Sequence, residues 1–128
     1  MPFQLLRDED KQYEFAAFTP ENFGNLESPP LIIFLHGSGE RGNDPGLPLK
    51  GNAHVFENLQ LPAAVIFPQC DLYHRAFYGE MEERVLRCIN VAVGQLGVNP
   101  QKLFLAGYSM GGSSDLWMAA KHPQKFKG

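Results

Sequence analysis

The stretch LFLAGYSMGG, residues 103–112, decides how the rest of the chain is interpreted. It starts with an apolar run and continues into a G-x-S-x-G pattern made by Gly107, Ser109 and Gly111. Because a helical pattern comes next, the serine is expected on a sharp turn between a strand and a helix, the setting of a nucleophile elbow. Glycine is needed at both flanking positions, since side chains there would collide where strand and helix approach each other. The alternative is a glycine-rich helix start in which Ser109 is only the N-cap.

Two further apolar runs, both earlier in the chain, also predict strands. Leu31 to Leu35 and Ala63 to Phe67 are continuously apolar and rich in Ile, Val and Phe. Such runs are typical of strands that are buried on both faces of a parallel sheet. The run from Leu103 to Ala106 has the same character, so the sequence predicts an α/β fold with parallel strands.

Helices are predicted between and after these strands. From Met81 to Leu96 apolar residues recur at helical spacing, Gly97 can end the helix in a left-handed cap, and Glu83 can pair with Arg87. The polar side of this helix is expected to carry Glu82, Glu83, Arg84, Arg87 and Gln95. A second helix is predicted from Met110 to Lys121, stopped by His122-Pro123, and a shorter one from Asn52 to Leu59.

The N-terminal part differs in character from the α/β core. Residues Phe3 to Leu6 and Gln12 to Phe18 are expected to form a β-hairpin, and residues 21–30 form a turn-rich connector. We therefore expect one domain over residues 1–128, with N-terminal strands and connector in 1–30 and the α/β core in 31–128.

Composition excludes several functions. The chain has 128 residues and a net charge of −3, and it lacks long basic runs, so no nucleic-acid binding is expected. The N-terminus lacks the apolar core of a signal peptide, and no stretch approaches the ~20 apolar residues of a membrane span. A cytoplasmic location is the resulting expectation. Cys70 and Cys88 fit reduced thiols, and a Cys70/His74 metal site lacks further ligands at suitable spacing.

The loop that follows the first apolar run, HGSGERG at residues 36–42, allows two interpretations. The spacing of Gly37, Gly39 and Gly42 is that of a dinucleotide-binding loop, whose third glycine lies in a helix that opens at once. Here prolines and glycines interrupt the segment after Gly42, and Asp71 comes too late to bind the ribose. Half of an oxyanion hole is therefore the favoured interpretation, and nucleotide binding the weaker one.

Three motifs in this order, HGSGERG (36–42), FPQC (67–70) and GYSMGG (107–112), resemble a known family. This family comprises α/β-hydrolase esterases of the phospholipase/carboxylesterase and predicted-peptidase type, which are relatives of dienelactone hydrolase and polyhydroxybutyrate depolymerase. The resemblance covers about Leu31 to Phe126. It implies the α/β-hydrolase fold with a doubly wound, mostly parallel sheet, a serine nucleophile, an ester or thioester substrate, and no cofactor or metal.

The resemblance also implies roles for individual residues. Ser109 is expected to attack the substrate carbonyl and form an acyl-enzyme. The backbone N–H groups of Ser38 and Met110 are expected to stabilise the oxyanion. The other motif residues would shape the backbone rather than bind phosphate: His36, Gly37, Gly39, Gly107 and Gly111.

A catalytic base for Ser109 is not evident. Hydrolases of this fold place an Asp or Glu and then a His after the serine, and here only Asp115 and His122 follow it. Both lie on the helix that Ser109 starts, about 9 and about 20 Å along its axis, whereas a hydrogen bond closes at about 3 Å. We therefore expect structural or solvent-facing roles for both residues.

The resulting hypothesis is that the chain is the N-terminal part of a serine esterase, and that this part is weakly active or inactive by itself. The resemblance also implies a strand that would follow Phe126 and pair with Leu103 to Ala106. Without it, that strand would have an open edge that favours self-association. The alternative function is a non-catalytic module, or pseudoenzyme, that keeps the elbow only as architecture.

Overall fold

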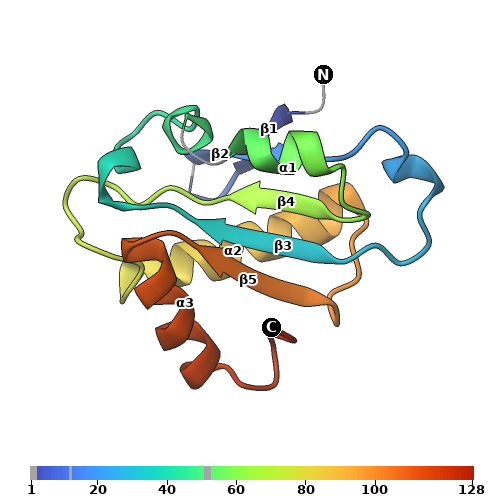
Figure 1. The fold of residues 1–128 in the computed structure, drawn as a ribbon. Coiled ribbons are helices and arrows are strands. Elements are labelled where there is room, and N and C mark those ends of the chain that lie inside the picture. Colours follow the sequence, from blue (N-terminus) through green and yellow to red (C-terminus); the bar gives the residue numbers. More distant parts are fainter. Residues whose placement is uncertain (1–2, 12, 51–52) are drawn as a thin grey trace.

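The computed structural model describes residues 3–11, 13–50 and 53–128. Its centre is a five-stranded sheet with the order β1-β2-β4-β3-β5. The strands are β1 (Phe3–Asp8), β2 (Tyr13–Phe18), β3 (Leu31–Leu35), β4 (Ala64–Phe67) and β5 (Leu103–Gly107). The helices are α1 (Ala53–Leu59), α2 (Glu80–Leu96) and α3 (Met110–Lys121), arranged as in Figure 1. The predicted α/β class is confirmed.

Strands β4, β3 and β5 form the parallel core of the sheet, as predicted. The predicted bounds differ from the observed ones by one residue, because Ala63 precedes β4 and Gly107 extends β5. Leu35 of β3 is in register with Gly107 of β5. The segments that follow these two strands therefore begin next to each other, at one edge of the sheet.

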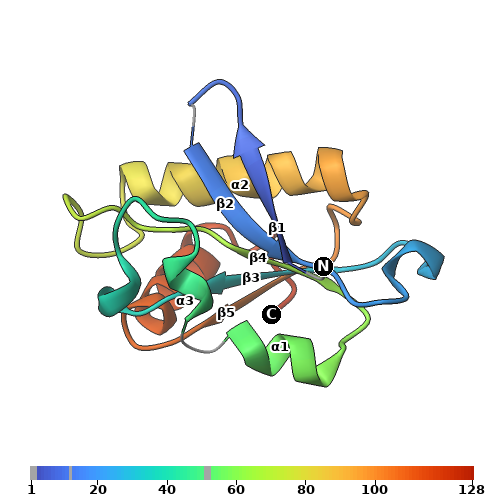
Figure 2. The same ribbon diagram turned by 90° about the horizontal axis from the view of Figure 1, so that it is seen from above.

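Helices cover both faces of the sheet, which confirms the doubly wound arrangement. Figure 2 shows α1 on one face and α2 on the other. Ile89 of α2 and Met118 of α3 belong to one buried cluster with Ile33 of the sheet. Phe56 of α1 packs against the second cluster, which contains Phe34. None of the helices in the described residues is long and apolar enough to cross a bilayer.

The predicted N-terminal hairpin is confirmed as an antiparallel pair of β1 and β2. Strand β2 then pairs antiparallel with β4, so the hairpin extends the parallel core on the side away from β5. The predicted first residue of the second strand, Gln12, lies outside the described residues.

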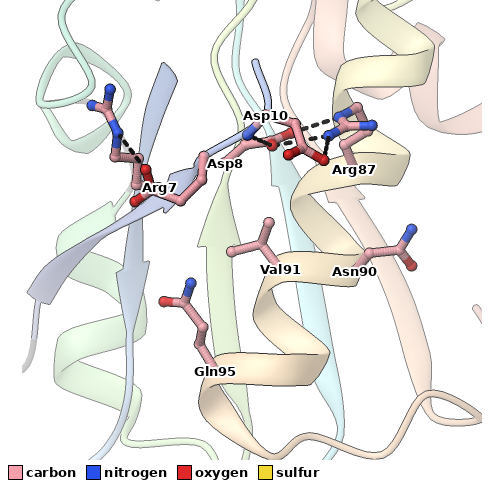
Figure 3. A pocket seen from close by; sticks show the side chains of 8 residues that line it. Arg7, Asp8, Asp10, Arg87, Asn90, Val91 and Gln95 are labelled. Atoms are coloured by element: carbon pink, nitrogen blue, oxygen red, sulfur yellow. Dashed lines mark hydrogen bonds and ion pairs between the residues drawn. The ribbon is translucent and has the colours of Figure 1, made fainter. Parts of the chain in front are cut away.

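An ion-pair cluster fastens the hairpin to α2. Arg87 donates to both carboxylate oxygens of Asp8, at 2.6 and 2.9 Å, and to Asp10 at 3.2 Å, and Figure 3 shows these side chains meeting. The hydrogen bonds from Arg87 lower the pKa of Asp8. The predicted pairing of Arg87 with Glu83 is therefore wrong, because a bidentate partner from the hairpin takes its place.

Helix α2 otherwise follows the prediction, with one further exception. Gly97 ends it with φ 72°, the left-handed cap that only glycine adopts without strain. Glu82, expected on the polar side, is 5% exposed instead. Its partners belong to α3 and to the residue directly after it, as described below.

The outer edge of β5 is partly covered by the end of the chain. The N–H of Lys127 donates to the Leu103 carbonyl at 2.7 Å, and the N–H of Leu105 donates to the Gly128 carbonyl at 2.8 Å. No strand lies on this side within the described residues, so the expected open edge is present only in part. Figure 1 shows the C-terminus returning to β5.

Candidate active site

Ser109 occupies the sharp turn between β5 and α3. Its φ is 54° and its ψ is −112°, a conformation that costs a residue with a side chain about 1–3 kcal/mol. The strained serine predicted from G-x-S-x-G is thereby confirmed. The residue holds the N-cap position of α3, but its side chain makes no capping hydrogen bond. Because Ser109 is exposed, its hydroxyl is open to an incoming molecule.

The two glycines that flank Ser109 leave no room for a side chain. A Cβ on Gly111 would overlap the carbonyl oxygen of Leu35, and one on Gly107 would lie 2.5 Å from the carbonyl carbon of Gly111. Both obstacles are backbone atoms, which cannot rotate away as a side chain can. The predicted steric reason for these glycines is confirmed.

The loop after β3, residues 36–42, lies against the turn that carries Ser109. We call it the His36 loop. The Tyr108 N–H donates to the Leu35 carbonyl at 3.1 Å, and a Cβ on Gly37 would be 3.2 Å from the Tyr108 ring. The His36 loop and the Ser109 turn are therefore neighbours, as the oxyanion interpretation requires.

His36 fixes the start of this loop from inside the protein. Its side chain is fully buried, its Nε2 accepts the Cys70 N–H at 3.0 Å, and its Nδ1 lies 2.5 Å from the Gly37 carbonyl. Burial lowers the pKa of His36. Since an amide N–H can only donate, the ring proton is on Nδ1, where it is donated to the Gly37 carbonyl. The neutral ring thus links the loop to the end of β4.

The two backbone N–H groups predicted to form the oxyanion hole belong to Ser38 and Met110. Ser38 opens a short 3-10 turn, Ser38–Glu40, and Met110 is the first residue of α3. The N–H groups at the start of a helix have no partner within the helix. Neither of these two donates to an acceptor in the described part of the chain. They are available to an external acceptor.

The structure shows no packing reason for Gly39, and Gly42 lacks the helix that the weaker, dinucleotide interpretation requires. A Cβ on Gly39 would meet nothing within 4 Å, so no close approach of the protein's own backbone requires this glycine. No helix begins at Gly42 either. The next helical element is a 3-10 turn, Leu47–Leu49, which is followed by α1. The helix N-terminus on which a dinucleotide loop depends is absent at this point.

The segment between β4 and α2, residues 68–79, completes the same edge of the sheet. We call it the 68–79 segment. The Gly42 N–H donates to the Cys70 carbonyl at 2.9 Å, and the Phe77 N–H donates to the Ser114 hydroxyl at 3.1 Å. The segment is therefore tied both to the His36 loop and to α3. Only FPQC at its start was identified from the sequence.

Asp115 is only partly exposed, and one of its two carboxylate oxygens is buried. It lies against Gly107, and its Oδ1 is buried without a hydrogen-bond partner in the described residues. Burial raises the pKa of Asp115 to about 7. A buried acceptor without a donor is costly, so this carboxyl is an unusual feature of α3.

His122 has the structural role that was expected. Its Nε2 is 3.1 Å from Oε2 of Glu82 on α2. Trp117 and Lys121 donate to Oε1 of the same carboxylate at 2.8 and 3.2 Å. Glu82, which sequence analysis assigned to the surface, thus clamps α3 onto α2, and the clamp helps to hold the helix that carries the Ser109 turn.

The remaining candidate groups show no separate site. Cys70 and Cys88 are free and buried, as expected, and burial raises the pKa of the Cys70 thiol to about 11. Such thiols are not nucleophiles at neutral pH. The part of the chain that the structure describes contains no group of three potential metal ligands.

The geometry defines a class of protein: an α/β fold with a strained, exposed serine between a parallel strand and a helix, beside a loop with free N–H groups. The family model named Esterase, described as "Putative esterase", matches residues 10–128. The chain therefore belongs to this esterase family. The comparison with curated proteins found no match.

Solved structures of esterases share the fold. The chain is similar to a thermostable esterase (TM-score 0.75, 23% identity), covering 97% of this chain and 38% of that one. It is also similar to the fluorophosphonate-binding serine hydrolase FphF of Staphylococcus aureus (0.70, 19%, covering 97% and 53%) and to an acetyl xylan esterase from Aspergillus awamori (0.68, 20%, covering 97% and 48%). The chain thus spans between 38% and 53% of the length of these three proteins.

Proposed function

We propose that the chain carries the nucleophile and the oxyanion-binding groups of a serine hydrolase that acts on carboxylic esters or thioesters. The observation that carries the proposal is the strained conformation of an exposed serine, φ 54° at Ser109, between two glycines that permit no side chain. Strained residues of this kind cluster at active sites and ligand-binding loops. Membership of the esterase family supports the same conclusion.

In the proposed reaction the Ser109 hydroxyl attacks the carbonyl carbon of the ester. The carbonyl oxygen becomes an oxyanion, which accepts hydrogen bonds from the N–H groups of Ser38 and Met110. One such donor can lower the activation barrier by about 3 kcal/mol. The alcohol or thiol then leaves, and water releases the acyl group from Ser109.

The proposed attack needs a base that takes the proton from Ser109. Three histidine side chains are described, and none of them forms a hydrogen bond with the Ser109 hydroxyl in the described residues; their partners are Cys70 for His36, Asp71 for His74 and Glu82 for His122. His54 lies outside the described side chains. We therefore assign the base and its acidic partner to residues other than these three histidines, further along the polypeptide or in a second chain.

Ester hydrolysis tests this proposal. The assay uses the complete polypeptide, which means the 128 residues together with any residues that follow Gly128 in the natural protein. Wild-type protein and the variants Ser109→Ala and Ser113→Ala are compared on p-nitrophenyl acetate and butyrate. Ser113 is an exposed serine on the same helix, so its variant controls for removal of a hydroxyl. We expect Ser109→Ala to lose at least about 1,000-fold in kcat, as nucleophile removal does in other serine hydrolases, and Ser113→Ala to stay close to wild type.

Hydrolysis that survives Ser109→Ala would remove Ser109 from its proposed role. Absence of hydrolysis in all three proteins, together with intact folding, would favour the alternative of a non-catalytic module that keeps the elbow as architecture.

A further inference from the structure

A second feature of the active-site edge is a pocket of about 510 Å³ between the His36 loop and the 68–79 segment. It is lined by Ser38, Arg41, Leu72, Tyr73, His74 and Arg75. Ser38 belongs both to this pocket and to the proposed oxyanion hole. A molecule whose carbonyl oxygen is bound at the Ser38 N–H could therefore extend directly into the pocket.

The lining carries two guanidinium groups and no carboxylate. Arg75 is exposed and has no ion pair within the described residues. Asp71 of the same segment is ionised beside His74, with its Oδ1 accepting from the Tyr73 N–H at 3.0 Å and lying 2.6 Å from Nδ1 of His74. One carboxylate thus stands near two guanidinium groups, and the pocket keeps a net positive charge.

Arg41 is held in position before any ligand arrives. Its Nε donates to the Ser38 carbonyl at 3.0 Å and its Nη1 to the His74 carbonyl at 2.9 Å. These bonds leave Nη2 free within the described residues. A fixed guanidinium loses little conformational entropy on binding an anion, and its planar fork matches a carboxylate.

The apolar side chains of the lining suit a short carbon chain. Leu72 is 69% exposed and Tyr73 is 94% exposed, at the tip of the segment. A ligand that covers these exposed apolar side chains lowers the free energy by roughly 25 cal/mol for each Å² of apolar surface removed from water. The pocket therefore combines cations with an apolar wall.

From this arrangement we infer that the substrate is an ester or thioester that bears an anionic group, such as a carboxylate, a few carbons from its carbonyl. Arg41 and Arg75 bind the anion, Leu72 and Tyr73 cover the carbons between it and the carbonyl, and Ser38 joins this pocket to the reaction centre. The inference rests on the proposed function, since it names the substrate class of the same site.

An NMR titration with glutarate tests the binding site without requiring catalysis. Glutarate and the uncharged 1,5-pentanediol are titrated into the 128-residue chain, and the Nε–Hε signals of its arginines are followed. We expect saturable shifts at Arg41 and Arg75 with glutarate alone, weaker at high salt. Arg75→Gln should weaken glutarate binding at least about threefold. Arg7→Gln is the control, because Arg7 is a partly exposed arginine on β1 outside this pocket and should change nothing.

The same titration on Ser109→Ala separates this inference from the proposed function. Glutarate should bind this variant as it binds wild type, whether or not Ser109 is the nucleophile. Absence of saturable shifts, or equal binding by Arg75→Gln and wild type, would overturn the anionic pocket. Loss of the nucleophile role of Ser109 in the hydrolysis assay, with glutarate binding retained, would overturn the proposed reaction instead.

In the hydrolysis assay the complete polypeptide is then compared on two p-nitrophenyl esters of equal chain length, the glutarate monoester and the pentanoate. Arg75→Gln should lower kcat/KM for the glutarate monoester at least about threefold and leave the pentanoate unchanged. An equal loss on both esters would contradict recognition of the anion by Arg75.

Discussion

Two glycine-rich turns meet at the same edge of the sheet, and they use glycine for different reasons. In the turn around Ser109, a side chain on Gly107 or Gly111 would run into backbone atoms. In the His36 loop, a Cβ on Gly37 would be tight only against the Tyr108 ring, at 3.2 Å, and one on Gly39 would meet nothing within 4 Å. The first turn is determined by the packing of strand against helix, whereas the second is shaped mainly by hydrogen bonds.

The difference shows which part of the site is rigid. Close backbone packing allows no partial adjustment, so the position of Ser109 is set together with the fold. The His36 loop is held by the His36 ring, by the Gly42 N–H on the Cys70 carbonyl, and by Arg41. Such bonds each contribute about 1 kcal/mol, so we expect a substitution in this loop to cost less stability than one that forces the backbone around Ser109 apart.

The largest effect is expected from Gly111→Ala. Its Cβ would overlap the Leu35 carbonyl, so α3 and β3 must move apart, at a cost of about 3 kcal/mol or more. Gly112→Ala is the matched control, because its Cβ would lie 3.9 Å from the Gly107 carbonyl oxygen, an ordinary contact, and alanine is favoured in a helix. Urea unfolding of the two variants measures the difference. Equal stability of both would contradict a tightly packed elbow.

A smaller effect is expected from Asp115→Asn, and it depends on pH. Burial raises the pKa of Asp115 to about 7, so the folded chain holds a proton that the unfolded chain releases near pH 4. The contribution of this proton to the free energy of unfolding is fully present below about pH 4, and it is lost as the pH rises through about 7.

The asparagine variant stays neutral at every pH. Relative to it, the wild type should therefore lose about 1–2 kcal/mol between pH 4 and pH 7.5, an amount already reduced for partial solvent screening. Urea unfolding of both proteins at several pH values gives this difference directly, because the lowered pKa values of Asp8, Asp71 and Glu82 affect both proteins equally. Parallel pH profiles would show that Asp115 is hydrated in the folded state.

The smallest effect is expected in the His36 loop, from Gly37→Ala compared with Gly39→Ala. The backbone of Gly37 is extended, with φ −79°, so alanine is allowed there, and the exposed Tyr108 ring can move away from the new methyl group. Thermal unfolding should show less than about 1 kcal/mol of destabilisation for Gly37→Ala, and still less for Gly39→Ala. A loss as large as that of Gly111→Ala would show that both turns are equally rigid.

Local patterns predicted much of the fold and of the site. The continuous apolar runs predicted β3, β4 and β5 to within one residue, because a strand buried on both faces tolerates few polar side chains. Gly97 predicted the end of α2, since a left-handed cap is a local requirement. The spacing of Gly107, Ser109 and Gly111 predicted the strained turn, because this turn too is a local requirement of the chain.

What failed depends on residues that are distant in the sequence. Arg87 pairs with Asp8 of the hairpin rather than with Glu83 one turn away, because the hairpin offers two oxygens in bidentate geometry. Glu82 is buried because α3 and His122 directly after it supply three partners that helical periodicity cannot reveal. The pocket between the His36 loop and the 68–79 segment was likewise invisible, since it arises only when two loops from different strands meet.

The central claim is that Ser109 is the nucleophile, and locating the adduct of a fluorophosphonate probe tests it most directly. The complete polypeptide is labelled, cleaved with trypsin, and the peptide of residues 103–121 is fragmented in a mass spectrometer; this peptide also contains Ser113 and Ser114 as internal controls. The account predicts the adduct on Ser109 alone and its loss in Ser109→Ala. An adduct on another residue, or a folded wild-type protein without any adduct, would contradict it.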